Sequence, residues 1–330
     1  MQIWQPSRRI FARAATLLLL LSIAFMCAAC EEASEKAAQT PSASGIVYAS
    51  TKDIRDINPH LYGGEMAAQG MVFESLVINT KEGVKPWLAT SWDISEDGTT
   101  YTFHLRENVF FTDGTAFDAE AVRLNIEAVL ANRLRHAWLD LVNEISSCEV
   151  VDKHTVRLTL AHPYYPTLVE LGLVRPFRFI SPKCFKEGGT AKGVTALVGT
   201  GPWILKDHKR GEYALFEANT KYWGEKPGLD FVRWKVVPDH QAIILGLQKG
   251  EIDLVFGADG DMFSLDNFEA LKAMGGLATA QSQPIASRAI LVNAHQPFTG
   301  ERAVREALQY AVDRQAIVDG LLNGTETRAD

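Results

Sequence analysis

The sequence is poor in the residues that build metal clusters and disulfide frameworks. It holds four cysteines among 330 residues, and its eight histidines are scattered without a pair at i, i+4 spacing. GxSxG, HExxH and P-loop sequences are absent, and GTGPW at 199–203 is too short for a dinucleotide fingerprint. No internal repeat is visible. These absences argue against an enzyme and against a metal held directly by the protein, and they leave open a catalytic triad assembled in space.

An excess of positive charge is missing too. The formal net charge is −7, which argues against nucleic acid or anionic lipid as a general partner. Against this background, basic residues gather in two short segments, NRLRHAWLDL at 132–141 and LVRPFRF at 173–179. The two segments together hold four arginines, one histidine and one tryptophan, and their ligand is the question that the sequence raises.

The amino terminus has the pattern of an export signal. Three arginines precede the apolar run AATLLLLLSIAFMCAA at 14–29, which is short for a membrane span. Two alanines stand directly before Cys30, which resembles the cleavage box of a bacterial lipoprotein. We therefore expect a signal peptide over 1–29, a lipid on Cys30 and a flexible tether over 30–45, so that only the lipid holds the exported chain at a membrane. An ordinary secretory peptide remains the alternative, and the general secretory and twin-arginine routes both remain open.

Strand and helix patterns interleave from residue 45 onward, which predicts an α/β or mixed α+β class. Tyr101, Phe103 and Leu105 alternate as on a strand, and Asp118 is placed to cap a helix. Near the carboxyl end, AILVNA at 289–294 and the strand in GEIDLVFG are predicted to be buried. The segment AVREALQYAV is predicted to be an amphipathic helix with Val304, Leu308, Ala311 and Val312 turned inward, and Asp313 is predicted to cap the next helix. Whether Cys148 and Cys184 form a disulfide stays open.

Five separated motifs resemble one known family. They are the stretch from PWLATSW to FDAEAV at 86–122, GTGPWIL at 199–205, YWGEKP at 222–227, GEIDLV at 250–255 and AVREALQYAVDRQAIVDGLLNG at 303–324. In this order they resemble the peptide/nickel family of ABC-transporter solute-binding proteins, extracellular solute-binding protein family 5. NPHLY at 58–62 and RLRHAWLDL at 133–141 resemble its nickel-binding branch more specifically.

The resemblance implies an α/β, two-lobed periplasmic-binding-protein (venus-flytrap) fold with the ligand between the lobes. It places lobe I at 46–283, nearly complete, and the start of lobe II at 284–330. Family members continue beyond NGTETRAD, so we expect a carboxyl-terminally truncated chain whose second lobe is largely missing. It further implies an exported monomer, not an enzyme, that carries nickel(II) as a chelate with histidine or a carboxylate-rich metallophore, binds no other cofactor, and hands the chelate to an ABC permease.

The resemblance also assigns the arginine-rich segments. Arg135 and Arg175 match the family's carboxylate-binding arginines, Trp138 its cleft indole, Met66 a cleft methionine near the metal, and Tyr62 a position on the cleft wall. Guanidinium forks bind carboxylates bidentately and stay charged at any useful pH, which suits a chelate with several carboxylates. If the segment is helical, Arg135 and Trp138 share one face.

Other basic residues receive structural interpretations. Imidazole suits nickel, which makes His136 tempting as a metal ligand, yet the family's ligating histidine belongs to the second lobe and no position here matches it. We therefore expect no metal ligand from this chain, a structural role for His60, and surface or packing roles for Arg133 and Arg178.

Two alternative functions stay open. One is a di- or oligopeptide-binding member of the same family, and the other is a sensor that presents its ligand to a chemoreceptor. The sequence leaves undecided the chelator, nickel against other divalent metals, the permease, and whether the chain works at this length.

Overall fold

The computed structural model describes residues 44–256, 264–282 and 289–328, with the exception of 323 and 325. The predicted signal peptide, the predicted lipidation site Cys30, most of the tether and the predicted lobe boundary at Pro284 lie outside the described residues. Within the described part, no helix is both long enough and apolar enough to cross a membrane.

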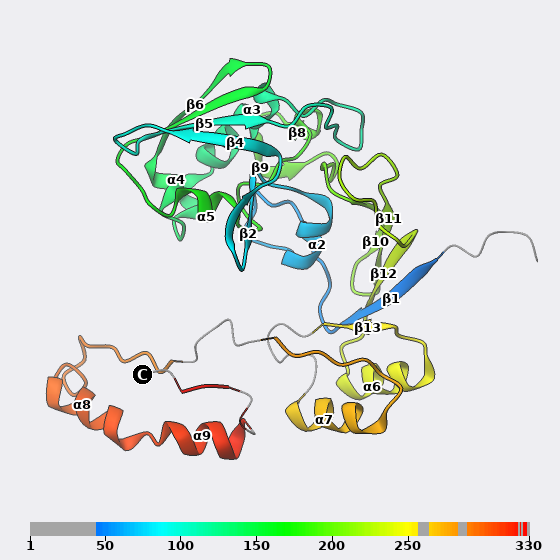
Figure 1. Ribbon diagram of the computed structural model, residues 1–330. Helices are drawn as coiled ribbons and strands as arrows, with labels where there is room; N and C mark the ends of the chain where they lie inside the picture. The colour runs from blue at the N-terminus through cyan, green and yellow to red at the C-terminus, as the bar shows by residue number, and fades with distance from the viewer. Residues whose placement is uncertain (1–43, 257–263, 283–288, 323, 325, 329–330) are drawn as a thin grey trace, which may run out of the picture.

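A four-stranded antiparallel sheet forms one half of the upper part in Figure 1. Its order is β4-β5-β7-β6, with β4 at Ala89–Ile94, β5 at Thr100–Leu105, β6 at Ile145–Asp152 and β7 at Thr155–Leu160. The predicted alternation on β5 is confirmed, because Tyr101, Phe103 and Leu105 are all buried. Helix α3, Ala119–Ala131, packs on this sheet, and the Asp118 carboxylate caps it by accepting from the Ala121 amide, as expected.

A five-stranded sheet forms the second half. Its order is β10-β11-β12-β1-β13, with β1 at Gly45–Ser50, β10 at Trp203–Lys209, β11 at Tyr213–Ala218, β12 at Phe231–Val236 and β13 at Leu254–Val255. The first described strand, β1, lies between two late strands and is parallel to both. Strands β10 and β11 pair as an antiparallel hairpin. Strand β13 has only two residues and Leu254 is exposed, contrary to the buried strand expected there.

Short elements join the two sheets. Helix α2 spans Met66–Val72, β2 and β3 span Val77–Thr80 and Gly83–Pro86, and β8 and β9 span Phe185–Lys186 and Gly189–Val194. The remaining short helices are η1 at Arg133–His136, α4 at Leu141–Glu144, α5 at Thr167–Leu171 and η2 at Pro182–Cys184. Cys148 and Cys184 are both buried free thiols, which answers the disulfide question in the negative.

The buried carboxylate of Glu74 ties the two halves together. Its Oε1 accepts from Trp87 Nε1 at 2.8 Å and from the Tyr222 hydroxyl at 2.6 Å. Its Oε2 accepts from Trp223 Nε1 at 2.9 Å and from the Thr200 hydroxyl at 2.7 Å. Burial raises the pKa of Glu74, and the four donors oppose that shift. Three motifs of the family resemblance, PW, GTGPW and YWGEKP, thus supply the donors to one structural carboxylate.

The carboxyl-terminal helices lie in a lower row in Figure 1: α6 at His240–Lys249, α7 at Leu265–Met274, α8 at Arg302–Ala311 and α9 at Arg314–Leu321. Asp313 caps α9 as expected. The predicted strand at 289–294 is wrong, since that segment is irregular and Leu291 is 94% exposed. Helix α8 forms, but it has no buried residue and Leu308 is 44% exposed, so the expected inward face is not buried by the described residues.

Candidate ligand-binding surface

The loop before α2 presents Tyr62 to solvent. Gly64 in this loop has φ +73°, and a Cβ there would collide with the Asp56 carbonyl oxygen, so the backbone turn requires glycine. The buried side chain of Gln69 on α2 donates to the Gly63 carbonyl at 3.0 Å and fixes the turn from behind. The ring of Tyr62, 59% exposed, is therefore held outward by a tightly turned backbone.

Arg175 docks on this loop. Its Nη1 donates to the Gly63 carbonyl at 2.8 Å, and its guanidinium lies over the Tyr62 ring at 4.7 Å from the centroid. Among the described residues, the hydrogen bonds of the guanidinium use Nη1 alone. The other two nitrogens of this half-buried guanidinium therefore carry donors that no described residue uses.

Trp138 extends the same surface. Its ring meets the Tyr62 ring edge-on at 5.7 Å between centroids, and it is 49% exposed. The structure thus brings three of the predicted residues, Arg175, Tyr62 and Trp138, into one continuous patch, which we call the aromatic–arginine surface. A cation beside two exposed rings can hold a carboxylate and cover an apolar part of the same ligand.

Arg135 and Met66 lie on the neighbouring elements. Arg135 is exposed in the 3-10 helix η1, which ends at His136, so it and Trp138 do not share the face of an α-helix. Met66 is the first residue of α2 and is 53% exposed. The described contacts join neither side chain to the aromatic–arginine surface, and both remain predicted ligand contacts.

Two buried histidines lie behind this surface. His60 and His136 are 0% and 1% exposed, so neither offers a nitrogen to a ligand in this conformation. His136 Nε2 donates to the His60 carbonyl at 3.0 Å, and His60 Nε2 donates to the Arg178 carbonyl at 2.9 Å. Burial lowers the pKa of His60 to about 4 and also lowers that of His136, which Arg135 depresses further. The structural role expected for His60 is confirmed.

The other basic residues of the two segments pack against backbone. Arg178 donates to the Phe73 carbonyl at 2.5 Å and to the Leu173 carbonyl at 3.3 Å, and burial lowers its pKa to about 10. Arg133 donates to the Ile145 carbonyl at 3.1 Å. Both contacts fit the packing roles that the sequence suggested for these arginines.

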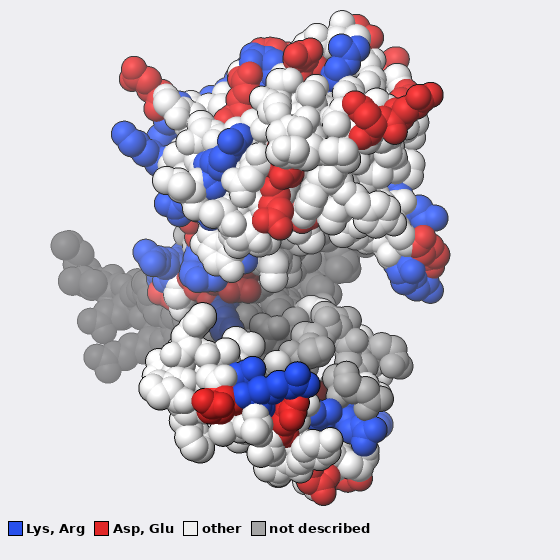
Figure 2. Space-filling model, turned by 90° about the vertical axis from the view of Figure 1, so that its left-hand side faces the viewer, with Lys and Arg blue, Asp and Glu red and all other residues white. Residues whose placement is uncertain are grey.

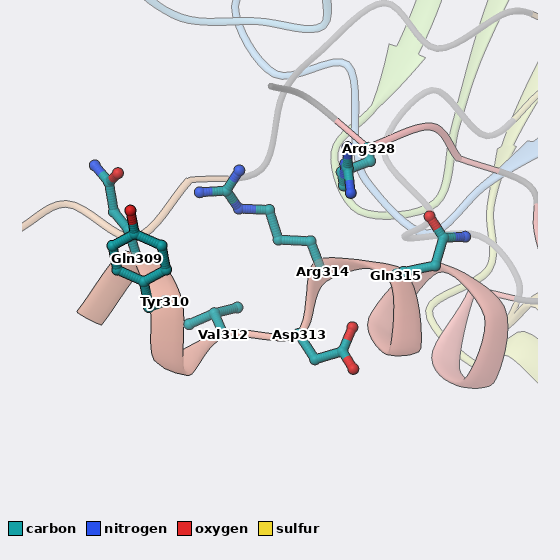
Figure 3. Close-up of a pocket in the computed structure, with 7 residues that line it drawn as sticks. All are labelled: Gln309, Tyr310, Val312, Asp313, Arg314, Gln315 and Arg328. Carbon is teal, nitrogen blue, oxygen red and sulfur yellow. The ribbon is translucent and has the colours of Figure 1, made fainter. Parts of the chain in front are cut away.

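No cluster among the described residues brings together three His, Cys, Asp or Glu side chains able to hold a metal ion. A separate hollow lies at the junction of α8 and α9, where Arg314 points toward Gln309 and Tyr310 while Asp313 points away (Figure 3). None of the predicted binding residues lines it. The face in Figure 2 carries acidic and basic side chains interspersed. The aromatic–arginine surface is therefore the candidate site.

The family of the chain follows from a direct comparison. The model of the bacterial extracellular solute-binding proteins, family 5, matches residues 83–330. The chain belongs to this family. Its members are solute-binding components of transporters, and the predicted α/β, two-lobed class of fold is confirmed by the solved structure of NikA from Brucella suis.

Three similar proteins are named for binding nickel or were solved with a bound metal complex. The nickel-binding periplasmic protein of Escherichia coli is 44% identical over 299 residues, which are 87% of this chain and 57% of that protein. The NikA structure from Brucella suis, in complex with Fe(III)-EDTA, is 46% identical with a TM-score of 0.83, over 87% of this chain and 58% of that one. NikZ from Campylobacter jejuni, in complex with Ni(L-His), is 28% identical with a TM-score of 0.72, over 85% and 55%. This chain thus spans less than two thirds of each.

Sequence reasoning missed the residues that hold the aromatic–arginine surface in place. The Gly63 carbonyl anchors Arg175 across 112 positions, and the His60 carbonyl anchors His136 across 76. Every residue has a backbone carbonyl, so the residue type does not show which carbonyl accepts a hydrogen bond. The doubled glycine in YGGEM, which indicates a tight turn, was the one available signal.

Proposed function

We propose that this chain is the substrate-binding component of an ABC importer, which captures nickel(II) as a chelate and delivers it to the membrane permease. The observation that carries the proposal is the Arg175 guanidinium, which is docked by one nitrogen against the Tyr62 loop and keeps the rest of its fork for a carboxylate. The chelates in the two NikA and NikZ structures, a polycarboxylate and an amino acid complex, support a ligand of this chemistry.

In this proposal the protein recognises the chelator rather than the metal. Arg175 and Arg135 bind carboxylates of the chelator, Tyr62 and Trp138 cover its carbon skeleton, and Met66 lies toward the metal. The chelator supplies the strong metal ligands, so nickel is cargo and the chain needs no resident cofactor and performs no catalysis. The proposed histidine or carboxylate-rich metallophore also balances the metal's charge before it meets two arginines.

The rest of the proposal concerns the whole protein. We assign 46–283 to lobe I and 284–330 to the start of lobe II, with ligand capture completed when lobe II closes over the surface. The chain is exported and monomeric, and it stays at the membrane through a lipid on Cys30 after removal of 1–29.

Calorimetric titration of residues 31–330 tests the binding step. We expect nickel with L-histidine to bind, and free nickel and a short peptide not to bind. Arg175→Ala should weaken chelate binding about 10- to 100-fold, since a hydrogen bond to a charged group contributes about 1.5–3 kcal/mol. Arg157→Ala, an exposed arginine on β7, is the matched control and should leave the affinity unchanged.

Two results would contradict this function. Peptide binding in place of chelate binding would move the chain to the peptide-binding branch of the family. Chelate binding that survives Arg175→Ala at full strength would place the ligand elsewhere on the chain.

A further inference from the structure

We propose that His136 and His60 are positioning residues, which form a buried two-link chain that holds the three segments of the aromatic–arginine surface in register. The inference rests on the proposed function only in that it assigns binding to this surface. Neither histidine touches the ligand in this scheme.

Both links run from an imidazole to a backbone carbonyl. His136 Nε2 donates to the His60 carbonyl at 3.0 Å, and His60 Nε2 donates to the Arg178 carbonyl at 2.9 Å. A carbonyl oxygen only accepts, so both neutral imidazoles carry their proton on Nε2. Nδ1 of His60 then accepts from the Thr190 hydroxyl at 2.9 Å, which adds strand β9 as a support behind the loop. The geometry therefore dictates one tautomer for each ring.

Each link joins backbone that also carries a surface residue. His136 stands two positions before Trp138, His60 stands two positions before Tyr62, and Arg178 stands three positions after Arg175. The surface side of the same three segments shows the Tyr62–Trp138 ring contact and the Arg175–Tyr62 stack. The two histidine links therefore fix the spacing of Tyr62, Trp138 and Arg175 on the aromatic–arginine surface.

The links are buried and neutral. His60 and His136 are 0% and 1% exposed, so water cannot replace a lost donor without entering the interior. Burial lowers the pKa of both rings, which keeps each in the single-proton form that the geometry requires. An apolar ring of similar size at 136 would fill the same space but could not donate, and the His60 carbonyl would lose its imidazole partner.

The test uses two substitutions that separate shape from hydrogen bonding. His136→Phe keeps a ring and removes the donor, whereas His136→Gln keeps an N–H near the position of Nε2. The first readout is the indole N–H resonance of Trp138 in chain 31–330 with ¹⁵N-labelled tryptophan, assigned with Trp138→Phe. The second readout is the affinity for nickel with L-histidine.

We expect His136→Phe to shift or broaden the Trp138 resonance and to weaken chelate binding about 10-fold, the equivalent of one lost hydrogen bond. His136→Gln should restore both. Trp234→Phe is the matched control, because it removes a ring donor to the Lys52 carbonyl at 3.2 Å on the five-stranded sheet. It should lower stability while the Trp138 resonance and the affinity stay unchanged.

The outcomes separate this inference from the proposed function. A Trp138 resonance unchanged in His136→Phe overturns the positioning role, whatever the ligand data show. If the Trp138 resonance moves in His136→Phe but the unmodified chain binds no chelate, the positioning role is supported and the proposed function is contradicted. If His136→Phe fails to fold, ¹⁵N-histidine spectra of the unmodified chain decide, because an Nδ1–H tautomer of His136 would overturn the inference.

Discussion

Replacement of Glu74 by glutamine changes one atom and should expose how the two halves of the upper part are joined. Each carboxylate oxygen accepts from one indole N–H and one hydroxyl: Trp87 and Tyr222 on Oε1, Trp223 and Thr200 on Oε2. In glutamine one of these positions becomes an NH₂ group. The hydroxyl that faces it can rotate and accept, but the indole cannot, so either amide orientation leaves one buried indole N–H opposed by another donor.

The size of the effect follows from this count. An unsatisfied buried donor costs about 1–3 kcal/mol, and the remaining bonds lose the assistance of a charged acceptor, so we expect Glu74→Gln to destabilise the fold by about 2–4 kcal/mol. Urea unfolding followed by far-ultraviolet circular dichroism should show a midpoint lowered by about 1 M. Circular dichroism is preferred to fluorescence because the substitution alters the surroundings of two tryptophans.

A double-mutant cycle decides the mechanism. Trp223→Phe removes one indole donor, so Glu74→Gln should cost less in that background, with a coupling of about 1–2 kcal/mol. Trp92→Phe, on β4 and without a bond to Glu74, should combine additively. Strict additivity with Trp223→Phe, or a Glu74→Gln variant as stable as the original chain, would refute the reasoning.

Three further predictions concern other parts of the structure. Burial lowers the pKa of His60 from 6.5 to about 4. The free energy of unfolding should therefore fall by about 3 kcal/mol as the pH falls from 6.5 to 4. Urea midpoints across this range should show that slope, and His60→Gln should flatten it; an equal slope in both proteins would contradict the assignment. Gly64→Ala should destabilise the chain by about 1–3 kcal/mol and weaken chelate binding. Gly63→Ala should do neither, because its Cβ would come no closer than 4.0 Å to another atom. Urea unfolding and calorimetry measure the two effects. Burial raises the pKa of Cys148 to about 12 and also that of Cys184, so a thiol reagent at pH 8 should label chain 31–330 only after urea is added, and rapid labelling in buffer would contradict their burial.

Local patterns predicted the elements that local interactions build. Asp118 caps α3 through an amide three positions away, and the alternation of Tyr101, Phe103 and Leu105 needs only one sheet face. The apolar segment at 289–294 has the same local pattern as a buried strand, yet no described strand pairs with it. A β-strand forms only when a neighbouring strand pairs with it, and the pattern of one segment does not show whether such a neighbour is present.

The candidate site divides in the same way. The family resemblance named Tyr62, Trp138 and Arg175, and the structure places them in one patch. It could not name what holds them, because His136 and Arg175 are anchored by backbone carbonyls distant in the sequence. The identity of a residue predicts what it can bind, whereas its orientation depends on contacts that only the assembled fold supplies.

The place of β1 in the five-stranded sheet has a consequence for the order in which the chain assembles. Gly45 pairs with Phe231, and Tyr48 also pairs with Leu254. Both edges of this early strand therefore pair with segments that are synthesised much later. Contacts so distant in sequence slow folding. During synthesis, β1 therefore stays unpaired on both sides until about 190 further residues have emerged.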